Sequence, residues 1–205
     1  MTDPKPTQNQ HPLLIVISGP SGVGKDSVLR GLKERMDNLH FVVTVNTREP
    51  RPDEEEGVDY LFISEEEFQR MLANGELLEN AHVYNDYKGV PREQVRSAMA
   101  SGKDVLLRLD VQGAATIREV AQEAILIFLN TASEEELVER LRSRGTDSAE
   151  DLEKRLQTAR EELARIDEYD YVVINAEGQL EEAITRIIEI ISLEHQREVR
   201  RQVSL

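Results

Sequence analysis

The chain has no cysteine, no long apolar run and little positive charge. Without thiols it can form neither disulfides nor thiolate metal sites, a composition that fits a reducing cytoplasm. No apolar run approaches the length of a membrane span. Residues 1–12 are polar and lack the apolar core of a secretory signal, so we expect a disordered tail there. These absences predict a cytoplasmic protein with no membrane partner.

Acidic residues outnumber basic ones, with 40 Asp and Glu against 25 Lys and Arg and a formal net charge of −15. This charge argues against nonspecific binding to nucleic acid, because the polyanionic backbone would be repelled. A local arginine cluster can still bind a small phosphorylated molecule. The length of 205 residues, 39% of them hydrophobic, fits one compact domain with inserted lobes.

A glycine-rich segment stands out at 19–25, which reads Gly-Pro-Ser-Gly-Val-Gly-Lys. It follows the apolar run 13–17 and precedes a helical pattern that begins near Asp26. Glycines let the backbone approach an anion, and the amides at a helix N-terminus favour phosphate. Lys25 adds a mobile point charge for the outer phosphates. The pattern therefore predicts a nucleoside triphosphate site, whereas a plain turn between strand and helix is the alternative.

The residue after the lysine departs from this motif. A Ser or Thr usually stands there as a magnesium ligand, but here Asp26 follows Lys25 and the hydroxyl comes one position later, at Ser27. A carboxylate can ligate magnesium directly. It can also serve only as a favourable acid in the first helical turn. Both interpretations of Asp26 remain open at this point.

Short apolar runs alternate with helical patterns along most of the chain. The runs are rich in β-branched residues and hardly alternate, which is typical of buried parallel strands. We expect strands at 13–17, 104–109, 124–129 and 171–174. We expect helices at 92–101 with Pro91 as the first helical residue, after the capping box at 133–136, at 149–166, and around 184–191. This alternation predicts an α/β fold with a mostly parallel sheet.

The alternation of strands and helices is interrupted over residues 44–90, which indicates a small inserted lobe. The segment begins with a rigid, basic turn and a short acidic run. Its expected elements are a turn at 48–52, a loop at 53–56, a strand at 60–63, a helix opening at Ser64, a strand at 77–78 and a turn at 84–89.

Several separate motifs together resemble those of the guanylate kinases over nearly the whole chain. They are GPSGVGK at 19–25, TREPRP at 47–52, GVDY at 57–60, LLEN at 77–80, LDVQG at 109–113 and RSRGTDS at 142–148. The resemblance implies a three-layer α/β P-loop fold with a mostly parallel central sheet, an inserted GMP-binding lobe and a short helical lid. It implies transfer of the γ-phosphoryl group of ATP to GMP with Mg2+ present, and dGMP is a further possible acceptor.

The resemblance also divides the chain. It implies a disordered tail at 1–12, a core nucleotide-binding domain at 13–43 and 91–132, a GMP-binding lobe at 44–90, a lid with flanking helices at 133–166, the last strand and helix of the core at 167–198, and a tail at 199–205.

The ATP-binding residues that it implies are Gly19, Pro20, Ser21, Gly22, Val23, Gly24, Lys25, Asp26, Ser27 and Asn175, the last against adenine. The GMP-binding residues that it implies are Thr44, Arg48, Arg51, Tyr60, Glu79, Lys88 and Asp110. Asp26 and Asp110 are the candidate magnesium ligands.

Two arginines flank Pro50, and its rigidity lowers the entropy cost of aiming both guanidiniums at one anion. Planar guanidiniums suit the oxygens of a monophosphate. We therefore expect Arg48 and Arg51 to bind the phosphate of GMP. As an alternative, both arginines only pair with the acids at 54–56 on the surface.

Glu79 is the candidate that recognises the base. Guanine presents two adjacent N–H donors to one carboxylate, adenine does not, and an unpaired buried carboxylate penalises the wrong base. Three positions depart from the usual pattern: Lys88 replaces a tyrosine, Val90 replaces a hydroxyl, and Arg108 replaces an aspartate. We expect weaker guanine selection, unless another group supplies the contact that Val90 cannot make.

A second basic cluster contains the expected catalytic arginines, Arg140, Arg144 and Arg155, which act with Lys25. Hinged helices can close such arginines over the γ-phosphate, where cations stabilise the transition state and water is excluded. Pairing with acids on the same helices is the alternative. No general base is evident, and none is needed because a phosphate acceptor is already ionised at neutral pH.

Two other functions remain as alternatives. The Gly-Lys-Asp-Ser sequence also resembles related P-loop kinases of ribose 1,5-bisphosphate, which a substrate panel would distinguish. Some guanylate-kinase-like domains are non-catalytic binding modules, but these lose the phosphate loop that is intact here at 19–25.

Overall fold

The computed structural model describes residues 11–51, 54–83, 86–143, 149–199, 201, 203 and 205. Most of the expected disordered tail, residues 1–10, lies outside the described residues. Across the described ranges, none of the helices has both the length and the apolar character that crossing a membrane requires.

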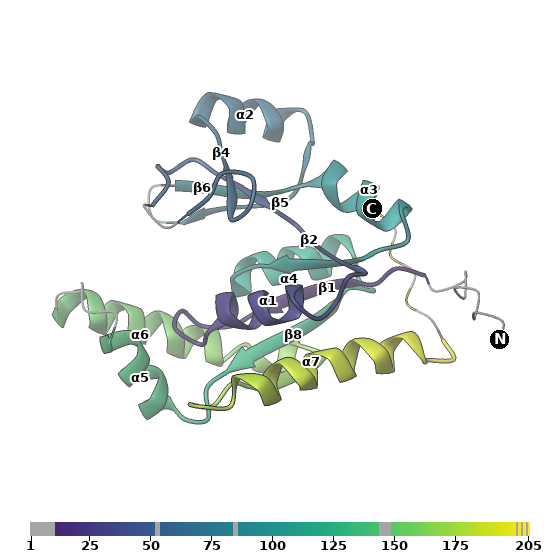
Figure 1. Ribbon diagram of the computed structural model, residues 1–205. Coiled ribbons are helices and arrows are strands. Elements are labelled where there is room, and N and C mark those ends of the chain that lie inside the picture. Colours follow the sequence, from purple (N-terminus) through teal and green to yellow (C-terminus); the bar gives the residue numbers. More distant parts are fainter. Residues whose placement is uncertain are drawn as a thin grey trace.

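A five-stranded, wholly parallel sheet forms the centre of the molecule (Figure 1). In spatial order its strands are β2 (Leu39–Phe41), β7 (Asp104–Arg108), β1 (Leu14–Ser18), β8 (Ile125–Asn130) and β9 (Tyr171–Ile174). The four strands expected from the apolar runs are therefore present, with bounds shifted by at most one residue. The edge strand β2 was not expected, because a three-residue Leu-His-Phe segment has too little pattern to be recognised.

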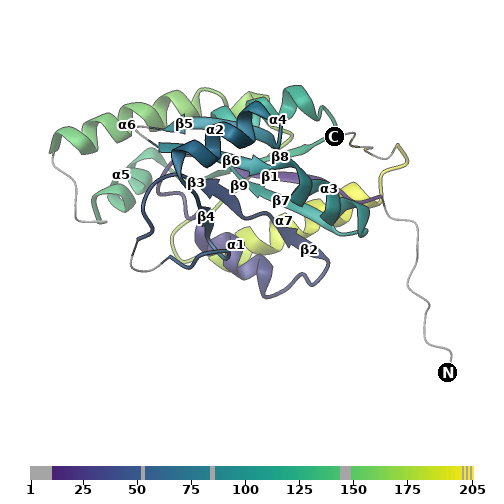
Figure 2. The same ribbon diagram turned by 90° about the horizontal axis from the view of Figure 1, so that it is seen from above.

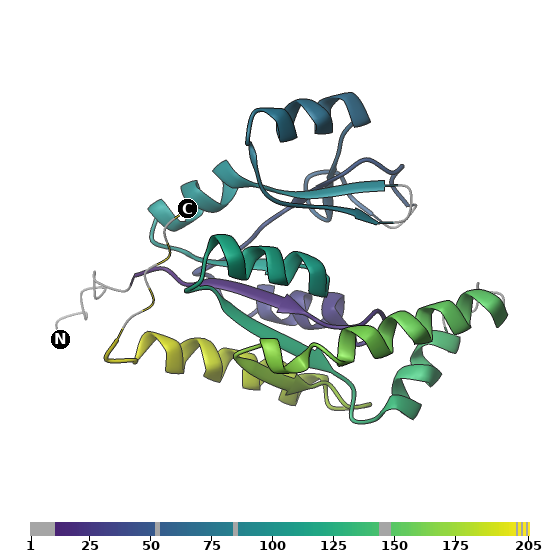
Figure 3. The same cartoon turned by 180° about the vertical axis from the view of Figure 1, so that it is seen from behind.

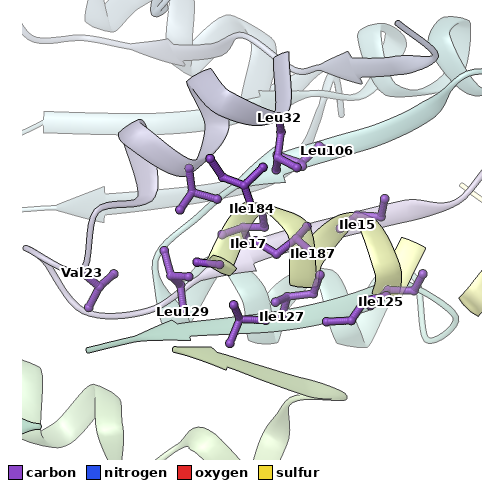
Figure 4. Close-up of a cluster of buried hydrophobic side chains, with 14 of the residues drawn as sticks. Ile15, Ile17, Val23, Leu32, Leu106, Ile125, Ile127, Leu129, Ile184 and Ile187 are labelled. Atoms are coloured by element: carbon purple, nitrogen blue, oxygen red, sulfur yellow. The ribbon is translucent and has the colours of Figure 1, made fainter. Parts of the chain in front are cut away.

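Side chains of β1 alternate between two helical layers, since successive residues of a strand point to opposite faces. Ile15 and Ile17 join a buried cluster with α1 (Lys25–Lys33) and α7 (Leu180–His195), which Figure 4 shows at close range. Leu14 and Val16 join a second cluster with α3 (Arg92–Ala100) and α4 (Val111–Val120) on the opposite face. Figures 1 and 3 show α1 and α4 on opposite sides of the sheet. The fold is the expected three-layer α/β arrangement.

Helix ends follow the capping signals with two corrections. Ser133 Oγ accepts from the Glu136 amide at 3.2 Å ahead of α5 (Glu134–Ser143), as the capping box predicts. Pro91 is the N-cap of α3 and the last residue of a strand, so it is not the first helical residue. The helix expected at 149–166 ends earlier: α6 spans Ala149–Leu163, and a short 3-10 turn follows at Ile166–Glu168.

A second, four-stranded sheet is built from the inserted segment and lies above the core in Figure 1. Its strands are β4 (Tyr60–Phe62), β3 (Thr44–Asn46), β6 (Asp86–Pro91) and β5 (Leu77–Val83), and α2 (Glu65–Ala73) covers it. Figure 2 views this unit from above the core. The turn expected at 84–89 is wrong from residue 86 on, because those residues pair with β5 as strand β6; residues 84–85 lie outside the described residues.

The described residues near the C-terminus are docked on the core. The Arg201 side chain is 12% exposed and forms ion pairs with Glu194 at 3.0 Å and Asp170 at 3.1 Å. Val203 and Leu205 pack against the cluster beneath α3 and α4. The expectation of a loose tail at 199–205 is wrong for these three residues, because long-range ion pairs and apolar contacts hold them in place.

Candidate active site

Three strands of the central sheet end at one edge, and expected site residues follow each of them. The phosphate loop, residues 19–24, follows β1, Asp110 follows β7, and Asn175 follows β9. Ligands of parallel α/β sheets bind at this edge, where helix N-termini offer amide donors. Helices α5 and α6 extend from the same edge (Figure 3).

The phosphate loop needs glycine at two positions for steric reasons. Gly19 has a φ of 139°, and a Cβ there would lie 2.1 Å from the carbonyl oxygen of Leu129. Gly24 has a φ of 90°, forms the N-cap of α1, and would place a Cβ 2.5 Å from Nδ2 of Asn175. Both values of φ belong to the left-handed region that side chains disfavour. The loop therefore packs tightly on its neighbours and presents the first turn of α1 at the sheet edge.

Lys25 is the first residue of α1, and its side chain folds back over the loop. Its Nζ donates to the carbonyl oxygens of Gly19 at 2.6 Å and Pro20 at 3.0 Å. Burial lowers the pKa of Lys25 to about 8, and nearby acids, first Glu162 and then Asp26, oppose that shift. Two carbonyl acceptors hold the ammonium where incoming phosphate oxygens can replace them.

Val23 connects the loop to two expected site residues. Its side chain is fully buried in the core, while its carbonyl accepts from Nδ2 of Asn175 at 2.8 Å and from Nη1 of Arg140 at 3.3 Å. Arg140 also donates to the carbonyl of Asn175 at 2.8 Å. Asn175 is only 4% exposed. Together the two side chains brace the phosphate loop. Among the other expected loop residues, Ser21 is exposed and Ser27 is half-buried.

The lid arginines are placed only in part. Arg140 forms an ion pair with Glu136 of its own helix, as the alternative interpretation expected. Arg155 is half-buried on α6. Arg144 lies outside the described residues. The structure thus brings Arg140 to the loop and leaves the joint action of the three arginines a prediction.

Asp26 and Arg108, two of the residues that depart from the usual pattern, contact each other. Oδ1 of Asp26, in the first turn of α1, pairs with Nη1 of Arg108 at the end of β7. Asp110 is the N-cap of α4, and its Oδ1 accepts from the Gly113 amide at 2.8 Å. Both carboxylates offer the hard oxygen donors that Mg2+ prefers. In the described parts of the chain, no cluster of three or more His, Cys, Asp or Glu side chains could hold a metal by itself.

The inserted sheet contributes the other basic residues. Arg48 grips Glu54 through two hydrogen bonds of 2.7 and 2.5 Å, which holds the pKa of Glu54 down at about 2. Its guanidinium carbon lies 5.2 Å from the centre of the Tyr60 ring. Arg51 is exposed, and its amide donates to Glu54 at 2.9 Å. In this structure Arg48 therefore pairs with an acid of the segment 54–56.

Lys88 lies on β6 opposite Asn46 of β3. Burial lowers the pKa of Lys88, and the guanidiniums of Arg48, Arg108 and Arg51 lower it further, while Asp110 opposes them. Arginines of both halves of the molecule thus lie close enough to Lys88 to influence its pKa. Thr44, on the same strand as Asn46, is buried, and so is Val90, whose side chain joins the apolar cluster beneath α3 and α4.

Glu79 reaches from β5 to the core and is 3% exposed. A Cβ on Gly113 of α4 would lie 2.9 Å from Oε1 of Glu79, so only glycine allows this approach. Burial, and secondarily repulsion by Asp110, raises the pKa of Glu79 to about 8, whereas Lys88 acts in the opposite direction. When such a buried acid is ionised, hydrogen bonds from paired N–H donors are needed to offset its lost hydration.

Two residues of the site were not expected from the sequence. Glu162 of α6 acts electrostatically on Lys25, and burial raises its own pKa. Asn46 is fully buried, and its Nδ2 has no hydrogen-bond partner among the described residues. Glu162 follows Arg155 by seven positions on the same helical face, which is the one signal that could have indicated it. A single polar residue in a three-residue strand offers no such signal.

Comparisons with known proteins give one consistent result. A family model described as guanylate kinase matches residues 11–194. Guanylate kinase 2, chloroplastic/mitochondrial, of Oryza sativa subsp. japonica is 50% identical over 195 residues, which cover 95% of this chain and 68% of that protein. The guanylate kinase of Latilactobacillus sakei subsp. sakei (strain 23K) is 43% identical, covering 90% of this chain and 91% of the relative. The crystal structure of guanylate kinase from Anaplasma phagocytophilum superposes with a TM-score of 0.76 at 34% identity, covering 92% of this chain and 89% of that one.

Proposed function

The chain belongs to the guanylate kinase family, and we propose that its phosphate loop binds ATP while its inserted sheet binds GMP. The reaction of this family transfers the γ-phosphoryl group of ATP to GMP and gives ADP and GDP. One observation carries the assignment of the two halves. Lys25 of the phosphate loop and Lys88 of the inserted sheet share the same two charged neighbours, Arg108 and Asp110. This shared electrostatic environment supports a meeting of the two sites at one point, as direct transfer requires.

On the ATP side, Lys25 is proposed to leave the carbonyls of Gly19 and Pro20 and bind the outer phosphates. The amides of the loop and of the first turn of α1 bind them from below. Arg140 and Asn175 keep the loop in shape through Val23, so that its amides need no reorganisation when ATP arrives.

On the GMP side, Glu79 is proposed to accept the two N–H donors of guanine. Before binding, the raised pKa of about 8 keeps its carboxyl largely protonated at neutral pH. Two N–H donors stabilise the ionised form, so binding of guanine releases a proton. This coupling favours a base that offers two donors over one that offers none.

The phosphate of GMP is proposed to bind in the cluster around Tyr60. Arg48, Arg51 and Lys88 supply positive charge there, and Thr44 supplies a hydroxyl at the neighbouring strand. An incoming phosphate competes with Glu54 for Arg48, since both are anions that accept two parallel hydrogen bonds.

Mg2+ is proposed to enter with ATP, and Asp26 and Asp110 are the residues that would hold it together with phosphate oxygens. Held there, Mg2+ would neutralise negative charge on the phosphate oxygens. The side chains of the protein are proposed to align the γ-phosphate of ATP with the phosphate of GMP and to exclude water. The proposed acceptor needs no protein base, because its phosphate is ionised.

The cytoplasmic location expected from the sequence stays a prediction.

An ADP-release assay across nucleoside monophosphates and ribose phosphates tests this proposal. We expect rapid ADP release with GMP, slower release with dGMP, and none with ribose 1,5-bisphosphate.

Lys25→Ala should lower kcat at least about 100-fold, because it removes a charge aimed at the transferred group. Lys103→Ala, an exposed lysine in a turn away from the loop, is the matched control and should keep wild-type activity.

Thermal unfolding should show that Lys25→Ala remains folded. Preferred turnover of ribose 1,5-bisphosphate, or full activity of Lys25→Ala, would contradict the proposal.

A further inference from the structure

Arg108 lies where the two proposed substrate sites meet. It is the last residue of β7, and it stands beside Ile17 of β1, two residues before the phosphate loop. Its side chain is 24% exposed, whereas that of its partner Asp26 is 72% exposed. The guanidinium is therefore held mainly inside, with its acid on the solvent side.

The Tyr60 ring brings two guanidiniums together. The guanidinium carbon of Arg108 lies 5.1 Å from the ring centre, and that of Arg48 lies 5.2 Å from the same centre. Arg108 is the last residue of β7 in the central sheet, and Arg48 lies two residues after β3 of the inserted sheet. Two guanidiniums beside one phenol can bind a dianion once Arg48 exchanges Glu54 for it, because the planar groups can donate several hydrogen bonds to its oxygens.

Among the described residues, the side chains that Arg108 contacts are assigned to the phosphate side of the site. Its partners are Asp26 and Tyr60. Glu79, the residue assigned to guanine, is influenced electrostatically by Asp110 and Lys88. The aspartate usually found at position 108 could accept hydrogen bonds from the N–H groups of a base. Arg108 can only donate hydrogen bonds, so it is better suited to bind an anion such as phosphate.

The ion pair also explains why two unusual residues occur in one chain. Position 26 usually carries a neutral Ser or Thr and position 108 an aspartate, a sum of −1. Here Asp26 and Arg108 sum to zero, so the pair is one unit more positive at the point where phosphates meet. Arg108 without Asp26 would place an uncompensated charge at a partly buried position.

We propose that Arg108 binds the phosphate of the acceptor nucleotide together with Arg48 and Tyr60, and that Asp26 positions Arg108 for this task. This inference rests on the proposed function and adds a specific residue to it. Asp26 is exposed and keeps the guanidinium over the Tyr60 ring. Without Asp26, other acids near Arg108, such as Asp59, would draw it away.

Calorimetry without ATP and without metal separates this role from any role of Asp26 toward magnesium. GMP and guanosine are titrated in turn into the wild type, Arg108→Ala and Arg108→Lys. We expect Arg108→Ala to bind GMP about 10- to 100-fold more weakly, the range for a charge-assisted bond, with guanosine binding unchanged. Arg108→Lys should recover part of the loss because it keeps the charge.

Arg118→Ala is the matched control, since Arg118 forms a comparable, partly exposed ion pair with Asp170. It should not change GMP binding. Asp26→Ser should weaken GMP binding about threefold in the wild-type background and not at all in the Arg108→Ala background, because coupled residues give non-additive effects.

Equal losses of GMP and guanosine affinity in Arg108→Ala would overturn the proposal, since they would indicate a merely structural ion pair. Unchanged GMP binding would overturn it as well, and additive effects of Asp26→Ser would remove the positioning role of Asp26. Turnover of GMP by the wild type is measured in parallel. Its absence would contradict the proposed function itself, whereas its presence with an unaffected Arg108→Ala would contradict only this inference.

Discussion

Glu79 shows how the environment of one residue sets its chemistry. On the sequence it is one of 40 acids. In the fold it is buried against Gly113, and its pKa is raised to about 8. An acid whose folded-state pKa exceeds its unfolded value makes the native state bind more protons between the two values. Its contribution to stability is therefore lost as the pH rises from about 4.5 toward 8.

Glu79→Gln tests this linkage, because the amide cannot ionise. We expect the free energy of unfolding of the wild type, relative to Glu79→Gln, to fall between pH 5 and pH 8. Urea denaturation of both proteins at four pH values in this range measures the difference. Glu76→Gln serves as the control: Glu76 is a half-buried acid just before the same strand, and hydrogen bonds from Asn74 and Arg70 lower its pKa, so it should show no comparable fall between pH 5 and pH 8.

Binding of GMP should also be coupled to release of a proton from Glu79. GMP binding to the wild type at pH 7 should release a proton, seen calorimetrically as a dependence of the binding enthalpy on the buffer, and Glu79→Gln should not show it. A difference in stability that is independent of pH would contradict the assigned pKa.

At the scale of elements, the phosphate loop depends on a few packing contacts between distant segments. Gly24 caps α1 in the left-handed region, with Asn175 against its backbone and Arg140 bonded to the neighbouring carbonyl. The strand, the loop and α1 are local in sequence, whereas α5 and the residue after β9 come from more than 100 positions away. The loop shape is therefore shared between a local motif and tertiary contacts.

Gly24→Ala should disturb both stability and ATP binding. A Cβ would strain the backbone and collide with Asn175, which we expect to cost about 1–3 kcal/mol of stability and at least about 10-fold in affinity for a non-hydrolysable ATP analogue. Chemical denaturation and calorimetry measure the two effects.

Gly75→Ala is the matched control for Gly24→Ala. Gly75 has a φ of 67° with nothing within 4 Å of an added Cβ. It should lose a similar part of the stability from backbone strain while ATP binding stays intact. An ATP affinity of Gly24→Ala equal to that of the wild type would contradict the assigned role of the loop shape.

At the scale of the whole molecule, the inserted sheet has an apolar cluster of its own. Phe68 of α2 is fully buried with Val45 and Leu77, and its ring stacks on Tyr87 at 5.1 Å between centroids. The core below is held by two separate clusters. A defect in the cluster of Phe68 should therefore affect the two nucleotides unequally.

Phe68→Ala should remove about 3–5 kcal/mol of packing from the inserted sheet. We expect the KM for GMP to rise at least about 10-fold, while affinity for the ATP analogue changes less than about twofold. Ile187→Ala, in the core cluster beneath α1, is the comparison and should lower the melting temperature and weaken both nucleotides. Equal losses of ATP and GMP affinity in Phe68→Ala would show that the two halves do not behave as separate packing units.

Sequence patterns predicted the features that depend on neighbours along the chain. Gly19 to Lys25 form a contiguous motif, and the apolar runs of the central sheet are long enough to be recognised. Short strands were harder: β2 was missed, and β6 was mistaken for a turn, because its Asp-Tyr-Lys-Gly-Val-Pro sequence carries turn residues and forms a strand only by pairing with β3 and β5.

The sequence by itself determined the α/β class, the phosphate loop and the set of residue types available for two phosphorylated substrates. Only the tertiary structure decided which charges meet. Asp26 pairs with Arg108 across 82 positions, and Glu79 is buried against α4. The reason is physical: a local motif fixes backbone geometry over a few residues, whereas ion pairing, burial and the pKa values that follow depend on distances that only the packed chain defines.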